Sequence, residues 1–508
     1  MNLKLNNKLL IFLVPFILGI STAFSLPPYN YFFINFITLP ILLFFLIKNN
    51  QKLKRISFYI GWMFGFGYFL QSLYWITNSL TFEEQFKILI PFALISIPLF
   101  LGLFYGVATL FISYFNLNYK FSSIIILSIA LGSIEYIRSI ILTGFPWNLF
   151  AYSLSNSINL IQLISFTGTY TFNLLCITVF LIPTIFIFDY KKITKISILL
   201  FFSVLVIFNF IYGSFTIKHF KNYDKSILET KIKIISPQIE VKRYFENENT
   251  EKIILELIKL SEPNNDEKTL FIFPEGVLSN IYLQDLNNYY YLFSENYSNK
   301  HNIIFGINSF EDPKVFNSMV LLDNNLSVLD IYKKNKLVPF GEFLPLENIL
   351  VNFGLKKITR GYKSFSKDSE RNVISLNNLK FLPLICYEII YSGNLNNNVE
   401  DFDFILNISE DGWFGNSEGP FQHFAHSIFR SIEEGKNLIR SANNGISAHI
   451  NPKGQIINQV GFNKKGIIEI KNIQKTKKTI YSIYGNKLLT YFLLIYILLF
   501  FTLKKYQN

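Results

Sequence analysis

The sequence predicts a membrane protein in two parts, an α-helical membrane domain of eight spans and an external α/β domain. Half of the 508 residues are hydrophobic and 17% are aromatic, which is high for a soluble enzyme and typical of a membrane protein. Long apolar runs separated by short polar loops fill the first 216 residues. From residue 217 to residue 487, short strand-like runs alternate with helical segments, which indicates a folded α/β domain.

The eight predicted spans are recognised by their length. A helix needs roughly 20 apolar residues to cross the hydrocarbon core of a bilayer. The runs occupy residues 9–26, 31–47, 57–78, 88–115, 122–143, 160–188, 196–216 and 488–503. Most reach or approach the required length, and the second and eighth are shorter. The first resembles a secretory signal, but further spans follow it at once and no small-residue cleavage site stands out, so it is expected to remain as a helix.

Basic residues predict the orientation of the spans. They occur in alternate loops, and the loops between, such as residues 25–30 and 78–86, carry none. The positive-inside rule therefore places both termini in the cytoplasm and residues 217–487 outside. The basic loop residues are Lys4, Lys8, Lys48, Lys52, Lys54, Arg55, Lys120, Lys191, Lys192, Lys195, Lys504 and Lys505. They account for nearly all of the net charge of +12, so no nucleic-acid partner is needed to explain it.

The same pattern predicts three segments. Residues 1–216 form the membrane domain with spans one to seven, residues 217–487 form the external catalytic domain, and residues 488–508 form span eight with a short cytoplasmic tail. Inside the fifth span, Glu135 and Arg138 are three residues apart and share one helix face. Because charges at this depth are costly, we expect a structural ion pair that locks helix packing. The alternative is a contact with a lipid headgroup near the segment GFPWN.

The external segment predicts a sheet covered on its faces, because near-continuous apolar strands alternate with helices. The predicted strands are 231–236, 269–274, 302–308, 327–332, 381–386, 402–409, 446–450 and 466–470, and the predicted helices are 249–261, 283–298 and 420–436. Reactive residues in such sheets collect at the strand ends. The strand ends are therefore where a catalytic site is expected.

A carboxylate, an ammonium and a thiol stand at three of these strand ends, contributed by Glu275, Lys334 and Cys386. A thiol attacks a carbonyl as thiolate, so it needs a base or a nearby positive charge. Glu275 can take the proton, while Lys334 and the backbone N–H of Tyr387 can stabilise an oxyanion. The set predicts acyl transfer through a thioester. Taken singly, each residue also has a structural explanation: packing for the cysteine, solvation for the lysine and a helix start for the glutamate.

The remaining candidate ligands have structural explanations. Cys176 lies in the sixth span and is expected to pack in its core, too far from Cys386 to form a disulfide. His423 and His426 form an HxxH pair, but no third ligand stands at a suitable spacing. We expect a satisfied structural pair of histidines and neither a metal nor a cofactor.

Six motifs are distinctive in this chain. They are GFPWN (144–148), FPEG (273–276), YKKNKLVPFGEFLPLE (332–347), CYE (386–388), NISEDGWFGNSEGPFQHF (407–424) and RSANNGISA (440–448). Together they resemble the carbon-nitrogen hydrolase (nitrilase) superfamily and, within it, the membrane-bound apolipoprotein N-acyltransferase family. The resemblance covers nearly the whole chain, spans included. The combination of LVPFGE, DGWFG and CYE is highly specific, whereas FPEG alone is weak.

The resemblance implies an αββα sandwich for the external domain and a role for each motif residue. It implies Glu275 as general base, Lys334 as stabiliser of the thiolate and oxyanion, and Cys386 as the acylated nucleophile. Supporting residues implied by the motifs are Glu342, an additional essential acid near the triad, and Tyr387, Glu388, Trp413 and Phe414, which shape the site.

Two details of the resemblance need care. Lys333 and Lys336 are close rivals for the lysine role, and Lys334 is preferred because it stands eight residues before the glutamate of PFGE, as in the family motif. The family tends to carry a tryptophan shortly after the dipeptide at 237–238. Here the corresponding position is about Lys242, and the nearest aromatic residues are Tyr244 and Phe245.

The resemblance further implies a two-step reaction. An acyl chain passes from the sn-1 position of a phospholipid, phosphatidylethanolamine, to Cys386, and then to the α-amino group of the diacylglyceryl-cysteine that begins an apolipoprotein. The implied partners are the phospholipid donor, the apolipoprotein acceptor and the membrane, without nucleic acid. The implied location is the bacterial inner membrane, with several spans, cytoplasmic termini and a periplasmic catalytic domain.

Alternatives remain open at the level of sequence. Residues 344–365 mix apolar and basic residues and are either an amphipathic lid on the outer leaflet or an ordinary surface loop. The same triad would serve a membrane-tethered amidase or nitrilase acting on a small carbon-nitrogen substrate. A membrane scaffold or transporter with a degenerate hydrolase domain is a further alternative, which the intact triad argues against.

Overall fold

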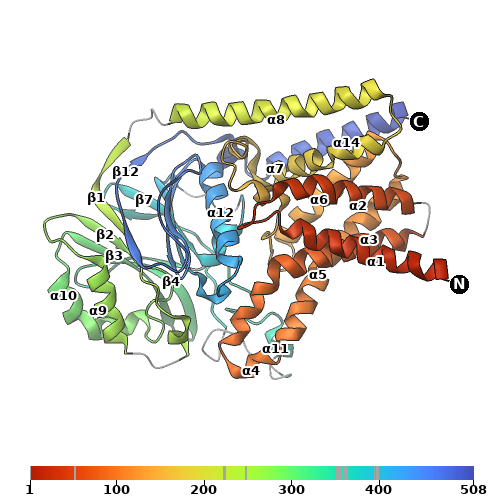
Figure 1. The fold of residues 1–508 in the computed structure, drawn as a ribbon. Coiled ribbons are helices and arrows are strands. Elements are labelled where there is room, and N and C mark those ends of the chain that lie inside the picture. Colours follow the sequence, from red (N-terminus) through yellow and green to blue (C-terminus); the bar gives the residue numbers. More distant parts are fainter. Residues whose placement is uncertain are drawn as a thin grey trace. The chain divides into compact units, whose positions relative to one another are not determined.

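The chain divides into two units in the computed structural model, which describes residues 2–50, 53–220, 225–245, 249–350, 352, 357, 364–393, 395 and 400–507 (Figure 1). The helical unit comprises Met1–Thr77, Ile88–Lys221 and Thr479–Asn508. The sheet unit comprises Asn78–Lys87 and Asn222–Lys478. Residues 78–87 thus belong to the sheet unit, although the chain before and after them belongs to the helical unit.

Among the residues that the structure describes, the helical unit has eight long helices, each of which overlaps one of the predicted spans. They are α1 (Asn2–Ala23), α2 (Asn35–Asn49), α3 (Lys54–Leu73), α5 (Ile90–Ile112), α6 (Phe121–Ile140), α7 (Ile164–Leu181), α8 (Lys192–Phe220) and α14 (Lys487–Gln507). Shorter elements are α13 (Ile480–Tyr484) and the 3₁₀ helices η1 (Phe32–Ile34), η2 (Tyr74–Thr81), η3 (Ser113–Phe115), η4 (Phe150–Leu154) and η5 (Ile182–Ile187).

Six stretches among the described residues are long and apolar enough to cross a membrane. They are Phe32–Asn49, Ile90–Phe115, Phe121–Ile140, Ile164–Ile187, Lys192–Phe220 and Lys487–Tyr506. α1 contributes a shorter apolar helix, Leu9–Ala23. α3 is not among the six, and its glycines and tyrosines make it less apolar than its neighbours. The protein is therefore a membrane protein with six clear span candidates.

Glu135 and Arg138 are both buried in α6, but they bind separate partners. Glu135 accepts a hydrogen bond from the Tyr105 hydroxyl of α5 at 2.6 Å and another from the Asn173 amide of α7. Arg138 donates to the carbonyl oxygen of Asn148, in the GFPWN segment, at 3.1 Å. Within the described residues no direct ion-pair contact joins the two side chains, so the expected contact pair is wrong, although the charge of Arg138 still acts on Glu135. Each side chain forms hydrogen bonds with neutral groups, and these bonds tie α6 to its neighbours.

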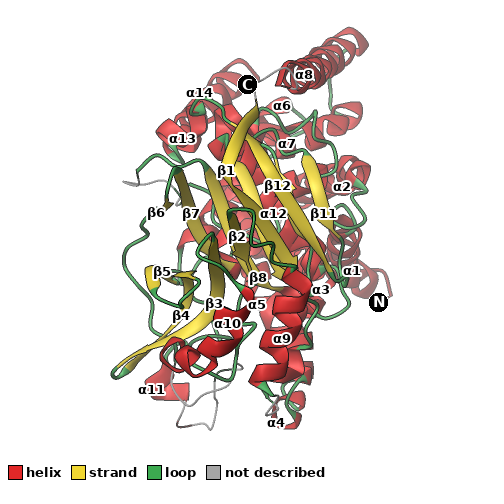
Figure 2. Ribbon diagram, turned by 90° about the vertical axis from the view of Figure 1, so that its left-hand side faces the viewer, coloured by secondary structure: helices red, strands yellow, loops and turns green. Residues whose placement is uncertain are grey.

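The sheet unit contains two six-stranded sheets (Figure 2). Their orders are β12-β1-β2-β3-β4-β5 and β11-β10-β9-β8-β7-β6. The strands are β1 (Lys225–Ser236), β2 (Thr269–Ile272), β3 (His301–Glu311), β4 (Lys314–Asp323), β5 (Val328–Lys333), β6 (Ile374–Leu376), β7 (Leu379–Ile385), β8 (Phe404–Glu410), β9 (Asn437–Asn443), β10 (Ser447–Ile450), β11 (Ile456–Val460) and β12 (Gly466–Gln474). All eight predicted strands are present, and β4, β6, β9 and β11 were not predicted.

Helices cover the outer faces of both sheets. The helical elements are α4 (Glu84–Lys87), α9 (Thr250–Ser261), α10 (Tyr290–Asn296), α11 (Glu347–Leu350), α12 (Gly419–Glu434) and the 3₁₀ helices η6 (Val241–Tyr244), η7 (Leu283–Tyr289), η9 (Cys386–Ile390) and η10 (Asp411–Phe414). α9 and α10 pack on the first sheet through one apolar cluster, and a second cluster fills the space between the sheets. α12 lies against the second sheet, so the unit is the expected αββα sandwich (Figure 1).

The predicted lid falls for the most part outside the described residues. Its beginning includes the short helix α11, and Val351, Phe353 and Leu355, the apolar residues on which the lid idea depends, are not described. The lid therefore stays a prediction.

Candidate active site

The pairing of the first sheet brings two of the predicted strand ends to one edge. β2 pairs parallel with β3, while β3, β4 and β5 pair antiparallel in succession, so β5 runs in the same direction as β2. Glu275 follows β2 and Lys334 follows β5 directly. Cys386 comes immediately after β7, which belongs to the second sheet. The three residues are thus contributed by two facing sheets.

Lys334 lies between two buried carboxylates. Its Nζ atom is 3.2 Å from Oε1 of Glu275 and 2.9 Å from Oε1 of Glu342. The Asn317 side chain, from β4, donates to the same two oxygens at 2.7 and 2.8 Å. An ammonium and an amide therefore hold the two carboxylates together, which unites the predicted general base, lysine and additional acid in one cluster.

Backbone N–H groups satisfy the outer oxygens of both carboxylates. Glu410 N–H donates to Oε2 of Glu275 and Val338 N–H donates to Oε2 of Glu342, each at 2.9 Å. Gly306 of β3 lets the strand pass close to the base, because a Cβ there would lie 2.4 Å from the Cα of Glu275. The carboxylates are therefore fixed in direction before any substrate arrives.

The structure separates Lys334 from its two rivals. Lys333 pairs with Glu311 at the surface, 2.5 Å away, and lies over the Phe316 ring. Lys336 lies over the Tyr391 ring at 5.7 Å. Of the three, Lys334 is the one that contacts both buried carboxylates.

Cys386 occupies a strained turn between β7 and η9. Its φ is +49°, in the left-handed region that costs a residue other than glycine about 1–3 kcal/mol. The side chain is 8% exposed and borders the core between the sheets. Such strain is often found where a reactive side chain must be held in one direction.

The electrostatic surroundings keep the thiol protonated and the lysine charged. Burial raises the pKa of Cys386 well above its usual value, and the charge of Glu275 raises it further, while Lys334 acts in the opposite direction. Burial lowers the pKa of Lys334, but the charges of Glu275 and Glu342 outweigh it and hold the pKa well above its usual value. The resting cysteine is therefore a neutral thiol, and a thiol in this state can act as a nucleophile only when a base takes its proton.

Glu388 joins the cysteine turn to the lysine loop. Its Oε2 accepts the N–H of Ile385 at 2.8 Å, next to the cysteine, and its Oε1 accepts the N–H groups of Asn335 and Lys336 at 2.9 and 3.1 Å. The Arg371 guanidinium lies 3.2 Å from the same carboxylate. Glu388 is fully buried, so this predicted supporting residue fixes the spacing between the Cys386 turn and the Lys334 loop.

A buried network supports the other side of the turn. Asp411 binds His423 at 2.9 Å and Arg440 at 2.8 Å, and His423 faces the carbonyl oxygen of Cys386 at 3.3 Å. Arg440 and His423 outweigh burial and hold the pKa of Asp411 below its usual value. The histidine of the HxxH pair is thus a structural hydrogen-bonding residue. The described residues include no group of three or more histidine, cysteine or acidic side chains placed to hold a metal.

Aromatic residues lie beside this centre. Trp413 packs against Tyr244 with ring centroids 5.1 Å apart and, edge-on, against Phe82 at 5.6 Å. Phe245 stacks on Phe82 at 6.1 Å, and the Asn78 amide donates to the carbonyl oxygen of Phe414 at 2.7 Å. The segment 78–87 therefore contributes directly to the aromatic cluster of Phe82, Tyr244, Phe245 and Trp413. Tyr387, the remaining predicted supporting residue, is buried and packs edge-on against Tyr391.

Sequence reasoning missed several residues of the site. Asn317 lies on β4, a strand that was not predicted, and nothing marked it as a bridge between carboxylates. Arg243 is fully buried and forms an ion pair with Glu410, whose backbone holds Glu275. Phe82 stood in a loop between predicted spans. The sequence could have indicated Glu410, because this residue lies in the motif that contains DGWFG. No sequence motif indicated Asn317, Arg243 or Phe82.

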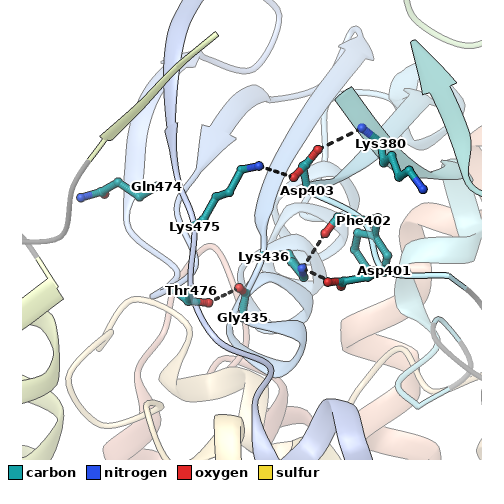
Figure 3. Close-up of a pocket in the computed structure, with 9 residues that line it drawn as sticks. All are labelled: Lys380, Asp401, Phe402, Asp403, Gly435, Lys436, Gln474, Lys475 and Thr476. Atoms are coloured by element: carbon teal, nitrogen blue, oxygen red, sulfur yellow. Dashed lines mark hydrogen bonds and ion pairs between the residues drawn. The ribbon is translucent and has the colours of Figure 1, made fainter. Parts of the chain in front are cut away.

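A separate pocket of about 340 Å³ lies elsewhere in the sheet unit (Figure 3). It is lined by Lys380, Asp401, Phe402, Asp403, Gly435, Lys436, Gln474, Lys475 and Thr476. Lys436 pairs with Asp401 at 3.1 Å and Lys475 pairs with Asp403 at 2.7 Å. None of the predicted catalytic residues lines this pocket, and its three lysines outnumber its two aspartates by one charge.

Comparison with known proteins agrees with both units. The model described as apolipoprotein N-acyltransferase N-terminal domain matches residues 18–182, and the carbon-nitrogen hydrolase model matches residues 288–477. Proteins named apolipoprotein N-acyltransferase from Rickettsia prowazekii and Rickettsia typhi are 34% and 33% identical to this chain. The matches cover 87% and 93% of this chain, and 88% and 94% of those proteins. Among solved structures, the CN-hydrolase superfamily protein XC1258 from Xanthomonas campestris has a TM-score of 0.35 at 13% identity, covering 52% of this chain and 97% of that one.

These matches define a membrane protein with a carbon-nitrogen hydrolase domain. The chain belongs to the apolipoprotein N-acyltransferase family, and its activity is acyl transfer. The family membership confirms the resemblance drawn from the motifs, and it favours the transferase over the amidase and scaffold alternatives.

Proposed function

We propose that this protein moves an acyl chain from a phospholipid, through a thioester on Cys386, to the N-terminal amine of a diacylglyceryl-apolipoprotein. The observation that carries the proposal is the position of Lys334 between Glu275 and Glu342, together with the influence of Glu275 and Lys334 on the Cys386 thiol. A thiol, a base and an ammonium are the groups that acyl transfer through a thioester requires.

The proposed first step forms the thioester. Glu275 takes the thiol proton as the sulfur attacks the ester carbonyl, and Lys334 stabilises the oxyanion, together with the backbone N–H of Tyr387. The tetrahedral intermediate collapses when the C–O bond breaks, and Glu275 returns the proton to the departing glycerol oxygen. Glu342 keeps Lys334 charged and in place throughout, since it contacts the same ammonium.

In the proposed second step the acceptor amine attacks the thioester carbonyl. Glu275 removes a proton from the attacking nitrogen, the C–S bond breaks, and Cys386 leaves as a thiolate that recovers its proton from Glu275. The products are an amide on the apolipoprotein and the free thiol. The donor is proposed to be phosphatidylethanolamine, with the acyl chain taken from the sn-1 position.

The membrane arrangement belongs to the same proposal. All eight long helices span the inner membrane, both termini are cytoplasmic, and residues 217–487 are periplasmic. A thiol reagent that does not cross membranes, applied to intact spheroplasts, should label a Lys314→Cys variant in the sheet unit and leave a Lys505→Cys variant unlabelled; both positions are exposed. The reverse labelling would refute the orientation.

Intact mass measurement tests the chemistry. The purified protein incubated with phosphatidylethanolamine should gain one acyl mass that hydroxylamine removes, and Cys386→Ser should gain none that hydroxylamine removes. Addition of a diacylglyceryl-cysteine lipopeptide should then discharge the acyl group onto the peptide. A wild-type protein that never gains the acyl mass contradicts the thioester route.

A further inference from the structure

Tyr244 is an aromatic residue beside the catalytic centre that the proposed chemistry does not use. It ends η6, two residues after Lys242. Its hydroxyl lies close to the backbone of Gly276, the residue that follows the proposed base Glu275. A Cβ atom built on Gly276 would lie 1.8 Å from the hydroxyl oxygen. The phenol therefore reaches the edge of the site at Glu275.

Two neighbouring side chains hold the ring of Tyr244. Trp413 packs against it at 5.1 Å, and the Arg243 guanidinium lies 4.6 Å from the ring centroid. Arg243 is itself fixed by hydrogen bonds to the carbonyl oxygen of Gly276 at 3.0 and 3.1 Å and by its ion pair with Glu410. A side chain immobilised in this way presents its hydroxyl in a defined place.

The hydroxyl is a donor without a protein acceptor. Among the residues that the structure describes, none forms a hydrogen bond with the Tyr244 oxygen. Burial raises the pKa of this phenol, and the charges of Glu410, Glu275 and Cys386 add to the effect against that of Arg243. The group therefore remains a neutral O–H donor at any pH at which the enzyme works.

We propose that Tyr244 is a substrate-positioning residue whose hydroxyl donates a hydrogen bond to an oxygen of the glycerophosphate part of the acyl donor. This rests on the proposed function. The reacting carbonyl oxygen is assigned to Lys334 and the backbone N–H of Tyr387, and the acyl chain carries no acceptor. The oxygens that remain on the donor belong to its lysophospholipid leaving group, and apart from those of the sn-2 ester they are glycerophosphate oxygens.

The test removes the hydroxyl and compares two donors of the same acyl chain. Acylation of the full-length Tyr244→Phe protein is followed by intact mass with dipalmitoyl phosphatidylethanolamine and with p-nitrophenyl palmitate, which lacks the glycerophosphate. We expect acylation by the phospholipid to fall roughly tenfold, the effect of one lost hydrogen bond, and acylation by the activated ester to remain unchanged. Discharge of the preformed thioester onto a diacylglyceryl-cysteine lipopeptide should also remain unchanged.

The outcomes separate this inference from the proposed function. Equal rates for variant and wild type with both donors, or equal losses with both, would overturn the role of Tyr244 while leaving the thioester chemistry intact. Slower discharge with unchanged loading would assign the hydroxyl to the acceptor and likewise overturn it. A wild-type protein that neither donor acylates would refute the proposed function itself. Tyr290→Phe, the same change at an exposed position of α10, serves as the matched control.

Discussion

The two units bury charge in opposite ways. In the helical unit, Glu135 and Arg138 each bind neutral groups, namely a hydroxyl, an amide and backbone carbonyl oxygens. In the sheet unit, one ammonium contacts two carboxylates, and a thiol stands within their electrostatic reach. The first arrangement spreads hydrogen bonds over several helices. The second concentrates three charges at one point, where removing one leaves the others without compensation.

The difference suits two purposes: the cluster in the helical unit stabilises the fold, and the cluster in the sheet unit is suited to a reaction. Neutral partners satisfy a buried charge without creating a strong local field, which suits a cluster that ties α6 to α5, α7 and the GFPWN segment. Two carboxylates around one lysine leave an excess negative charge beside Cys386, which keeps the resting thiol protonated and places a carboxylate nearby that can accept a proton. The comparison predicts how strongly each cluster responds to substitution.

Removal of the central ammonium should have the largest effect. Lys334→Ala leaves Glu275 and Glu342 buried without their cation, so we expect a loss of about 3–5 kcal/mol of stability and no acylation of Cys386. Thermal unfolding in detergent and intact mass measure the two effects. Lys333→Ala is the matched control, because its partner Glu311 is exposed and the change should cost about 1 kcal/mol or less. An unfolding midpoint for Lys334→Ala equal to that of Lys333→Ala would contradict the prediction.

A substitution in the helical cluster should cost less and spare the chemistry. Glu135→Gln keeps one accepting oxygen but turns an amide N–H₂ toward a donor, so about 1–3 kcal/mol of stability should be lost. Acylation of Cys386 by p-nitrophenyl palmitate should stay within about twofold of wild type, since no charge beside the thiol changes. A loss of acylation as complete as that of Lys334→Ala would break the distinction between the two clusters.

Sequence reasoning singled out Glu275, Lys334 and Cys386 because each follows a short apolar strand and belongs to a distinctive local motif, and the structure brings Lys334 into contact with Glu275. It also placed eight strands of the sandwich. It could not find Asn317, because the bridge between Glu275 and Glu342 depends on how β4 pairs with β3 and β5. It was wrong about Glu135 and Arg138, since helical spacing shows that two residues share a face but not which groups of other helices approach them. Contacts between distant segments were the part that local patterns could not supply.

Acid should weaken the sheet unit selectively. Burial lowers the pKa of His301 and His423, and it lowers the pKa of His449 to about 4. Below about pH 6.5 these histidines are protonated in the unfolded chain but remain neutral in the folded protein. The free energy of unfolding therefore falls as the pH drops from about 6.5 toward 4. For His449 alone the loss at pH 5 is about 2 kcal/mol. His449→Gln should therefore reduce the drop in unfolding midpoint between pH 7 and pH 5. An undiminished drop in His449→Gln would count against this assignment.

The smallest effect is expected in residues 78–87, the segment of the sheet unit that lies in the sequence between two parts of the helical unit. Phe82→Ala removes the ring that packs on Phe245 and Trp413, and aromatic contacts of this kind contribute about 0.5–1.5 kcal/mol each. Because Trp413 also packs against Tyr244, loosening it should slow acylation of Cys386 by phospholipid several-fold more than acylation by p-nitrophenyl palmitate, while the charges around the thiol stay in place.

Phe310→Ala provides the control for the loss of Phe82, since this exposed phenylalanine of the same unit packs against Tyr282 and contacts none of the catalytic residues. It should cost no more stability than Phe82→Ala and should match wild type in both acylation rates. If Phe82→Ala instead slowed both donors equally, the aromatic cluster would act on the triad rather than on the donor. Residues 78–87 would then act by positioning Glu275, Lys334 and Glu342, and not by contacting the phospholipid donor.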